Sequence, residues 1–366
     1  MSRILLIGNS GNKKHGTDGQ TVKVRLYYKK IKDEGFDIDF VDLENFSKKP
    51  IRTLWSIKKH LKTCNRIVLL TAERGSKILI PFINFFNRKY KKSFVFPLIG
   101  ISVLHSSIDN MSEEDKIDFL VNGNYSLSKP NKKLVKQLKK IDYILPETQL
   151  LTKAFTNFYG LNNVYQLNNF REEKQVSQAG SNSNSLRLVY VSRVMAIKGI
   201  FDILPVVKEL NNEGFDVVLD IYGNKKLSEE ESTTFDSYLD KDHIKYKGTI
   251  DYNSVTETIA NYDLFVFPTR YYGEGTPGVI AESLIAGVPI ITSDFPQAKY
   301  ILKDGFDSIF YKMTDIKELK DIIINIIRNK DKLIKMKANA YTSGKEYTYN
   351  HERKAFLRYI CGIGEE

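Results

Sequence analysis

Short apolar segments alternate with amphipathic helical segments along almost the whole chain, and this alternation limits the folds open to it. Segments 4–8, 67–70 and 264–267 are continuous apolar runs, which is typical of strands buried on both faces of a parallel sheet. Successive parallel strands need a long crossover, usually a helix. A chain of 366 residues exceeds the usual size of one such domain. The sequence therefore predicts an α/β protein with two doubly wound domains.

The alternation divides the chain into two similar halves. We expect strands in the first half near 4–8, 38–41, 67–70, 94–98, 143–145 and 164–167, and in the second half near 187–191, 217–222, 244–246, 264–267, 290–292 and 308–310. Segment 171–185 is polar and rich in Ser and Asn, without apolar periodicity. This composition predicts a linker or a mobile loop just after the domain boundary.

Two carboxylates eight positions apart stand out in the second half. Glu274 lies in a glycine-rich turn after a predicted strand, and Glu282 lies in a helix that Pro277 opens. The helix is almost wholly apolar, so we expect it to be buried. A charged Glu282 there would cost several kcal/mol, roughly, unless a polar group or ligand pairs with it.

The same window has the layout of a site for a nucleotide sugar. Backbone amides of Gly275, Thr276 and Gly278, at the start of the helix, would bind a phosphate. Glu282 further in would hold ribose hydroxyls, and Glu274 on the other side would hold a second hydroxylated group. From the residues alone, a solvated Glu274 and a core salt bridge for Glu282 remain open as the alternative.

Two cations follow the first predicted strand of the second half. Arg193 comes just beyond that strand and Lys198 starts a helix, so both would project from the carboxyl edge of the sheet, where α/β proteins bind ligands. An Arg and a Lys together would neutralise a diphosphate and stabilise the charge that develops as it leaves. Without further information, an ordinary surface Arg and helix-start Lys explain the pattern equally simply.

These windows resemble the signature of glycosyltransferase family 4, retaining enzymes with the GT-B fold. The run ProThrArgTyrTyrGlyGluGlyThrPro before Gly278, and AlaGlyValPro after the helix, are especially similar to bacterial members that build capsule and lipopolysaccharide O-antigen polysaccharides. Segment 190–200 resembles the family's Arg and Lys-Gly motif. The resemblance implies two Rossmann-like domains with a deep interdomain cleft and a C-terminal helix that crosses back to the first domain.

The resemblance also implies domain bounds and roles. Residues 1–170 would bind the acceptor, 171–345 would bind the nucleotide sugar, and 346–366 would pack back on the first domain. Glu274 would contact the donor sugar, Arg193 and Lys198 the diphosphate, and Gly275, Thr276, Pro277 and Glu282 the rest of the donor. The relatives often have a further Glu where this chain reads PheProGlnAlaLysTyr, so that role has no residue here.

The resemblance implies further site residues in the first domain. The loop between the first strand and the next helix faces the cleft in the family, which makes Gly16, Asp18, Gly19 and Gln20 candidates for contact with the acceptor or the phosphates. His105 follows a strand and is a candidate for contact with the donor sugar, although a satisfied core or surface histidine is an equally good interpretation.

Charge is distributed unevenly between the halves. Residues 1–170 hold 29 Lys and Arg against 15 Asp and Glu, whereas the rest of the chain is slightly acidic. Basic clusters at 29–32, 88–92 and 132–140 predict a face that binds anionic lipid or a phosphate-bearing acceptor. A solvated lysine-rich surface is the alternative. Nucleic acid is not expected as a partner, because the known recognition motifs are missing.

The remaining features predict neither cofactor nor metal. The Asp pairs at 37–39 and 240–242 match a metal motif of another glycosyltransferase fold, but they fall on an ordinary strand start and helix end. Cys64 and Cys361 have no metal or redox spacing, which suggests a reducing cytoplasm. No apolar run of 18 residues and no signal peptide are evident. We therefore expect a cytoplasmic protein peripheral to the inner face of the cell membrane.

The function expected from the sequence is sugar transfer. The donor would be a UDP- or GDP-sugar and the acceptor a saccharide, expected to be lipid-linked, in surface polysaccharide biosynthesis. Two alternatives remain open: a nucleotide-sugar epimerase with the same fold, and a basic, non-enzymatic protein that binds nucleic acid or anionic lipid.

Overall fold

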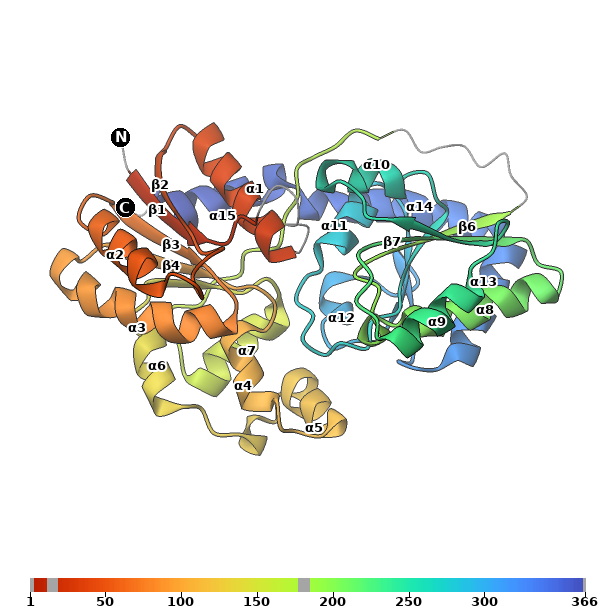
Figure 1. Cartoon of the computed structure of the whole chain (residues 1–366), viewed down its shortest axis with the longest axis horizontal. Coiled ribbons are helices and arrows are strands. Elements are labelled where there is room, and N and C mark those ends of the chain that lie inside the picture. Colours follow the sequence, from red (N-terminus) through yellow and green to blue (C-terminus); the bar gives the residue numbers. More distant parts are fainter. Residues whose placement is uncertain (1–2, 12–18, 177–184, 365–366) are drawn as a thin grey trace. The chain divides into compact units, whose positions relative to one another are not determined.

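The computed structural model describes residues 3–11, 19–176 and 185–364. The chain forms two compact units, of which the first comprises Met1–Asn169 and Glu352–Glu366 and the second comprises Phe170–His351 (Figure 1). The second unit is therefore continuous in sequence, whereas the first is built from two separate segments.

The first unit is built on a five-stranded parallel sheet in the order β2-β1-β3-β4-β5. Its strands are β1 (Arg3–Gly8), β2 (Asp37–Asp42), β3 (Arg66–Leu70), β4 (Ser93–Pro97) and β5 (Tyr143–Leu145). The central strands are buried on both faces, which explains why they read as continuous apolar runs.

Helices cover both faces of this sheet. They are α1 (Gly19–Asp33), α2 (Pro50–His60), α3 (Glu73–Tyr90), α4 (His105–Ile108), α5 (Glu113–Ile117), α6 (Lys132–Leu138) and α7 (Gln149–Tyr159). Ile57 of α2, Ile83 of α3 and Leu138 of α6 share one core with Leu5 and Ile7 of β1. Helix α1 covers the other face, where a Cβ on Gly8 would meet Val24 at 2.6 Å. The basic cluster at 29–32 thus lies on the opposite side of the sheet from those at 88–92 and 132–140.

One expected strand is absent. Segment 164–167 was expected to continue the first sheet, but within the described residues it contributes only an isolated bridge from Val164 to Ile144. In addition, the Tyr165 amide donates to the Ile144 carbonyl and the Leu167 amide donates to the Pro146 carbonyl. Leu167 is buried whereas Tyr165 is exposed, and the segment forms no regular ladder, so the apolar pattern alone misassigned it.

The second unit is built on a six-stranded parallel sheet in the order β11-β10-β9-β6-β7-β8. Its strands are β6 (Leu186–Val191), β7 (Val217–Tyr222), β8 (Ile244–Gly248), β9 (Leu264–Phe267), β10 (Ile290–Ser293) and β11 (Ser308–Tyr311). All six agree with the sequence-based expectation to within two residues at each end.

Two separate cores flank this sheet. One face packs against α8 (Ile200–Asn212), α9 (Glu229–Tyr238) and α13 (Ile316–Arg328). The other face packs against α10 (Val255–Ile259), α11 (Gly278–Ile285), α12 (Ala298–Ile301) and α14 (Lys330–Gly344). Helices on both faces of a parallel sheet give the doubly wound architecture that the alternating pattern predicts.

The last helix, α15 (Tyr349–Phe356), carries the chain back to the first unit. Its Phe356 ring packs edge-on against Tyr27 of α1 at 5.2 Å between centroids. Arg353 pairs bidentately with Glu34, at 2.7 and 2.6 Å. Within the described residues, no helix is long and apolar enough to cross a membrane.

Candidate active site

The candidate site lies at the point where the second sheet changes winding direction. Strands β6 and β9 are hydrogen-bonded neighbours, and successive strands are added outward from each of them, β7 and β8 on one side and β10 and β11 on the other. The loops that leave the carboxyl ends of two such strands diverge and open a crevice, which is where α/β proteins of this type bind ligands. Lys198 lies in the loop region after β6, and Glu274 in the loop after β9.

Backbone hydrogen bonds join the loop after β6 to the segment that follows β7. The amide of Val194 donates to the Asn224 carbonyl at 3.0 Å, and the amide of Lys226 donates back to Val194 at 2.9 Å. A 3-10 turn, Ala196–Lys198, then leads to Gly199 and into α8. Lys198 is thereby placed at the end of a fixed loop.

A close backbone approach ties the two loops together. Gly199 has a φ of +73°, and a Cβ there would lie 1.7 Å from the carbonyl oxygen of Pro268. The amide of Arg270 donates to the Ile197 carbonyl at 2.9 Å. Only glycine fits both the left-handed conformation and the contact. This contact brings Lys198 next to the turn that carries Glu274.

Lys198 and Glu274 form a buried ion pair. The Lys198 ammonium donates to Oε1 of Glu274, and the Thr269 hydroxyl donates to the same oxygen at 2.9 Å. The Tyr271 ring lies 4.9 Å from the Lys198 nitrogen and provides a cation–π contact. Two residues that the sequence assigned separately to the diphosphate and to the sugar are thus direct neighbours.

Arg193, the second expected cation, lies in the same loop and is exposed. Beneath it, the buried Tyr190 hydroxyl donates to the Arg193 carbonyl at 3.1 Å, and burial raises the pKa of that phenol. The backbone of the loop is therefore fixed while the Arg193 side chain faces solvent.

A further pair supports the loop after β9. Arg270 binds Asp202 of α8 through two hydrogen bonds, the one from Nε being 3.0 Å. Burial raises the pKa of Asp202, and Arg270 partly offsets this effect. Sequence reasoning did not identify this pair, because its members lie 68 positions apart.

The turn after Glu274 leads into α11 as expected. Gly275 and Thr276 are buried, Pro277 is the N-cap residue, and the helix begins at Gly278. Ile280 and Leu284 of α11 are buried in the core, and Glu282 of the same helix is buried as well. The predicted burial of this carboxylate is therefore observed.

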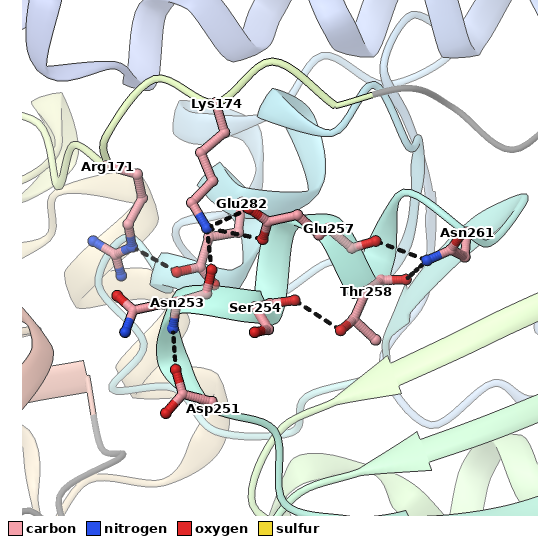
Figure 2. A network of polar contacts seen from close by, with 9 residues as sticks. All are labelled: Arg171, Lys174, Asp251, Asn253, Ser254, Glu257, Thr258, Asn261 and Glu282. Atoms are coloured by element: carbon pink, nitrogen blue, oxygen red, sulfur yellow. Dashed lines mark hydrogen bonds and ion pairs between the residues drawn. The ribbon is translucent and has the colours of Figure 1, made fainter.

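Glu282 is paired with an arginine that sequence reasoning missed. Nε of Arg171 donates to Oε1 of Glu282 at 3.0 Å, and both side chains are buried (Figure 2). Burial raises the pKa of Glu282, and the Arg171 charge and hydrogen bond lower it again in part. The protein itself therefore supplies the partner that Glu282 requires.

The position of Arg171 depends on its backbone and on one glycine. Its amide donates to the Tyr347 carbonyl and its own carbonyl accepts from the Tyr349 amide, each at 2.8 Å. Its guanidinium lies directly over Gly278, where a Cβ would be only 1.2 Å from Nη2. The expectation that 171–185 begins as a loose linker is wrong for Arg171, which is anchored in the second unit.

Lys174 extends this polar network away from α11. Its ammonium donates to both carboxylate oxygens of Glu257 at 2.8 Å and to the Asn253 carbonyl (Figure 2). Figure 2 shows Lys174 and Arg171 reaching from the same segment toward α10 and Glu282. Arg171 is thus tied to α11 and Lys174 to α10 and the turn before it.

The structure gives fewer contacts for the site residues that the sequence predicts in the first unit. Gly19 and Gln20 form the first turn of α1, while Gly16 and Asp18 lie outside the described residues. His105 begins α4, with Nδ1 at 3.5 Å from Glu73 and 3.8 Å from Asp109. Its local partners are thus two carboxylates of its own unit.

The arrangement in the second unit suits a ligand with a diphosphate and hydroxyl groups. Arg193 and Lys198 follow β6, and Lys198 contacts Glu274 in the turn before α11. Glu282 lies within α11. Among the described residues, no cluster of three or more His, Cys, Asp or Glu has the arrangement of a metal site.

Comparison with protein families gives a match within the second unit. Residues 171–343 match the family model for glycosyl transferases group 1. An uncharacterized glycosyltransferase of Methanocaldococcus jannaschii is 23% identical over 240 residues, and the match covers 59% of this chain and 59% of that relative.

Solved structures of similar fold cover nearly the whole chain. HepE of Anabaena in complex with UDP and glucose superposes with a TM-score of 0.73 at 12% identity, over 99% of this chain and 100% of that one. Sucrose-phosphate synthase of Thermosynechococcus elongatus gives 0.74 at 13% identity, with 99% of each chain covered. The lipopolysaccharide outer core galactosyltransferase WaaB gives 0.66 at 13%, over 98% and 99%. Residues 171–343 therefore match a glycosyl transferases group 1 domain, and the chain as a whole has a GT-B fold of two Rossmann-like units.

Proposed function

We propose that this chain is a retaining glycosyltransferase that moves a sugar from a UDP- or GDP-sugar to a lipid-linked saccharide in bacterial surface polysaccharide biosynthesis. The observation that carries the proposal is the buried Lys198–Glu274 pair at the switch point between β6 and β9. This pair lies inside the segment that matches glycosyl transferases group 1.

The donor would bind to the second unit. The diphosphate would compete with Glu274 for the Lys198 ammonium, and Arg193 and the amides at the start of α11 would neutralise its remaining charge. Glu274, released from Lys198, would accept hydrogen bonds from the sugar. Glu282, held by Arg171, would accept them from the ribose.

The transfer step would need no protein nucleophile. The bond between the anomeric carbon and the diphosphate oxygen breaks as the acceptor oxygen bonds to that carbon from the same face. The acceptor proton passes to the departing diphosphate oxygen. Lys198 and Arg193 would stabilise the negative charge on this leaving group, which is where such interactions lower the barrier most. The products are the elongated saccharide and a nucleoside diphosphate.

The compared proteins support a UDP-sugar and a surface polysaccharide. HepE was solved with UDP and glucose, and WaaB is a galactosyltransferase of the lipopolysaccharide outer core. We assign the acceptor to the first unit. Its candidates for contact with the acceptor or the phosphates are Gly16, Asp18, Gly19 and Gln20, and its candidate for contact with the donor sugar is His105. The lipid part of the acceptor would place the protein at the inner face of the cell membrane.

Ligand-induced stabilisation tests the donor site. UDP, GDP and ADP are each added to the protein and the melting temperature is measured, because a ligand of the folded state raises it. We expect one diphosphate to give the largest shift and Lys198→Met to remove it. A Tm that none of the three changes would contradict the proposal.

Product analysis tests the reaction. The protein is incubated with the preferred donor, with and without a membrane lipid extract as acceptor, and the products are separated. Transfer requires the extract and releases the nucleoside diphosphate. An epimerised donor formed without acceptor would instead identify an epimerase.

A further inference from the structure

Four of the large apolar side chains that the structure leaves exposed lie on two adjacent helices of the first unit. Ile51 and Trp55 of α2 are 82% and 65% exposed, and Ile78 and Phe85 of α3 are 52% and 63% exposed. Single exposed apolar residues are ordinary, whereas a group of this kind on neighbouring elements indicates an interaction surface.

The four side chains lie on the outer faces of their helices. Ile51 and Trp55 are four positions apart, so they share one side of α2, while Ile57 points into the core. On α3, Ile78 and Phe85 are seven positions apart and share one side, while Ile80 and Ile83 are buried. The inner faces hold the helices on the sheet, and the outer faces remain available.

Contacts between aromatic and basic side chains join the two helices. The Lys58 ammonium of α2 lies 4.8 Å from the Phe86 ring of α3, and the Phe85 and Phe86 rings meet edge-on at 5.0 Å. Figure 1 shows α2 and α3 next to each other on the same side of the first sheet. We call the exposed residues Ile51, Arg52, Trp55, Lys58, Lys59, Arg74, Lys77, Ile78, Phe85, Arg88 and Lys89 the α2–α3 face.

The α2–α3 face is strongly basic. Between Ile51 and Lys92, Glu73 is the only acidic residue, and all other charged side chains are Lys or Arg. Helix α6, which bonds to α3 through Asn84 and Gln137, adds Lys132, Lys133 and Lys136 and no carboxylate. Long basic side chains thus surround the apolar residues and reach beyond them.

We propose that the α2–α3 face docks the protein on an anionic lipid bilayer. Trp55, Phe85 and the two isoleucines would enter the boundary between headgroups and acyl chains, and the Lys and Arg side chains would bind headgroup phosphates. An aromatic residue with apolar neighbours and a basic rim is the composition that an interfacial surface requires.

The apolar residues favour a bilayer over nucleic acid. Phosphates of a nucleic acid would satisfy the basic rim, but Ile51 and Ile78 would then remain in contact with water. The density of like charge also disfavours a second copy of this chain, because two such faces would repel each other. Docking requires neither donor nor acceptor sugar, so it can be tested apart from the proposed reaction.

Trp55 offers a direct measurement, because the chain contains a single tryptophan. Fluorescence is recorded as vesicles are added, either of phosphatidylcholine alone or of phosphatidylcholine mixed with phosphatidylglycerol. We expect a blue shift only with the anionic vesicles, and quenching when the acyl chains are brominated. Equal responses to both vesicles, or no response to either, would overturn the proposal.

Variants separate insertion from charge attraction. Phe85→Ser retains the Trp55 reporter and should weaken binding to anionic vesicles by about tenfold. Arg52→Gln with Lys59→Gln should weaken it by about tenfold or more and reduce its dependence on salt. The matched control is Ile334→Ser on α14, since Ile334 is also 65% exposed but lies in the second unit.

A nucleic-acid competitor completes the test. A short DNA duplex and anionic vesicles are compared for binding to the wild type and to Phe85→Ser, with thermal melting to confirm that each variant is folded. Vesicle binding that depends on Phe85 supports the bilayer. Tighter binding to DNA with no effect of Phe85→Ser would identify a nucleic-acid surface and overturn the proposal.

Discussion

Arg171 and Glu282 lie 111 positions apart in the sequence and form a buried ion pair with 3.0 Å between Nε and Oε1. The pair joins the first residues of the second unit to the helix that follows the candidate donor site. The protein itself thus pairs and orients the carboxylate that we propose for ribose binding.

Removal of Arg171 should be costly, because it leaves a buried carboxylate without its partner. We expect Arg171→Met to lower the free energy of unfolding by about 3 to 5 kcal/mol, and Arg171→Met with Glu282→Gln to recover part of that loss. Denaturant melts of the single and double variants measure both effects. A single variant as stable as the wild type would show that the pair contributes nothing.

The same pair predicts a dependence on pH. Burial raises the pKa of Glu282 above its usual value of 4.5, so the folded chain holds that proton more tightly than the unfolded chain does. The contribution of this group to stability therefore falls as the pH rises from 4.5 through the raised pKa. Without Arg171 the pKa should rise further.

We therefore expect the loss of unfolding free energy caused by Arg171→Met to be largest at about pH 8 and smaller at about pH 5. Melting temperatures across this range test the sign. Glu282→Gln in the same background should remove the trend, because it removes the titrating group. A loss of stability in Arg171→Met that grows as the pH is lowered would contradict this prediction.

The Lys198–Glu274 pair should affect catalysis. We expect Glu274→Gln and Lys198→Met each to lower kcat by about 100-fold or more, because each removes a group that we propose to bind the leaving diphosphate or the sugar. Initial rates of nucleoside diphosphate release measure this. Glu257→Gln, which breaks the more exposed pair with Lys174, is the control and should retain most activity.

Gly199 should tolerate no side chain. Because Gly199→Ala would place Cβ 1.7 Å from the Pro268 oxygen, we expect it to cost about 3 kcal/mol or more and to reduce donor binding by displacing Lys198. Gly214→Ala is the matched control, since Gly214 also has a positive φ but nothing within 4 Å, and should cost only about 1 kcal/mol. Thermal melts with and without UDP compare the two.

We expect transfer to proceed without a divalent metal ion. Lys198, Arg193 and the start of α11 would supply the positive charge that a metal ion provides to the diphosphate in other enzymes. Rates measured after exhaustive treatment with EDTA, with and without added Mg²⁺ or Mn²⁺, test this. Loss of activity that Mg²⁺ or Mn²⁺ restores would contradict the prediction.

The central strands of both sheets, such as β3 and β9, could be predicted because they are buried on both faces. Continuous apolar runs such as 67–70 and 264–267 leave little alternative, and the turn and helix around Glu274 carry local glycine and proline signals. Segment 164–167 has the same apolar character but pairs only through Val164. Composition alone cannot distinguish an apolar segment that joins no ladder from a strand.

The partners of the site residues could not be predicted in the same way. Sequence reasoning inferred that Glu282 needs a partner, but Arg171 stands in a polar segment that reads as a linker. The backbone bonds of Arg171 with Tyr347 and Tyr349 help to place it over Gly278. Such a contact depends on how distant parts of the chain pack, and no local pattern encodes it.

The C-terminal return of the chain makes the second unit an insertion within the first. Residues 170–351 begin and end in one compact unit, so they could be expressed as a single uninterrupted piece. The first unit has no such piece: a chain stopped at residue 351 would deprive Tyr27 of Phe356, Glu34 of Arg353 and Arg66 of the Tyr359 carbonyl. A truncation at the far end of the sequence would therefore damage the domain that begins it.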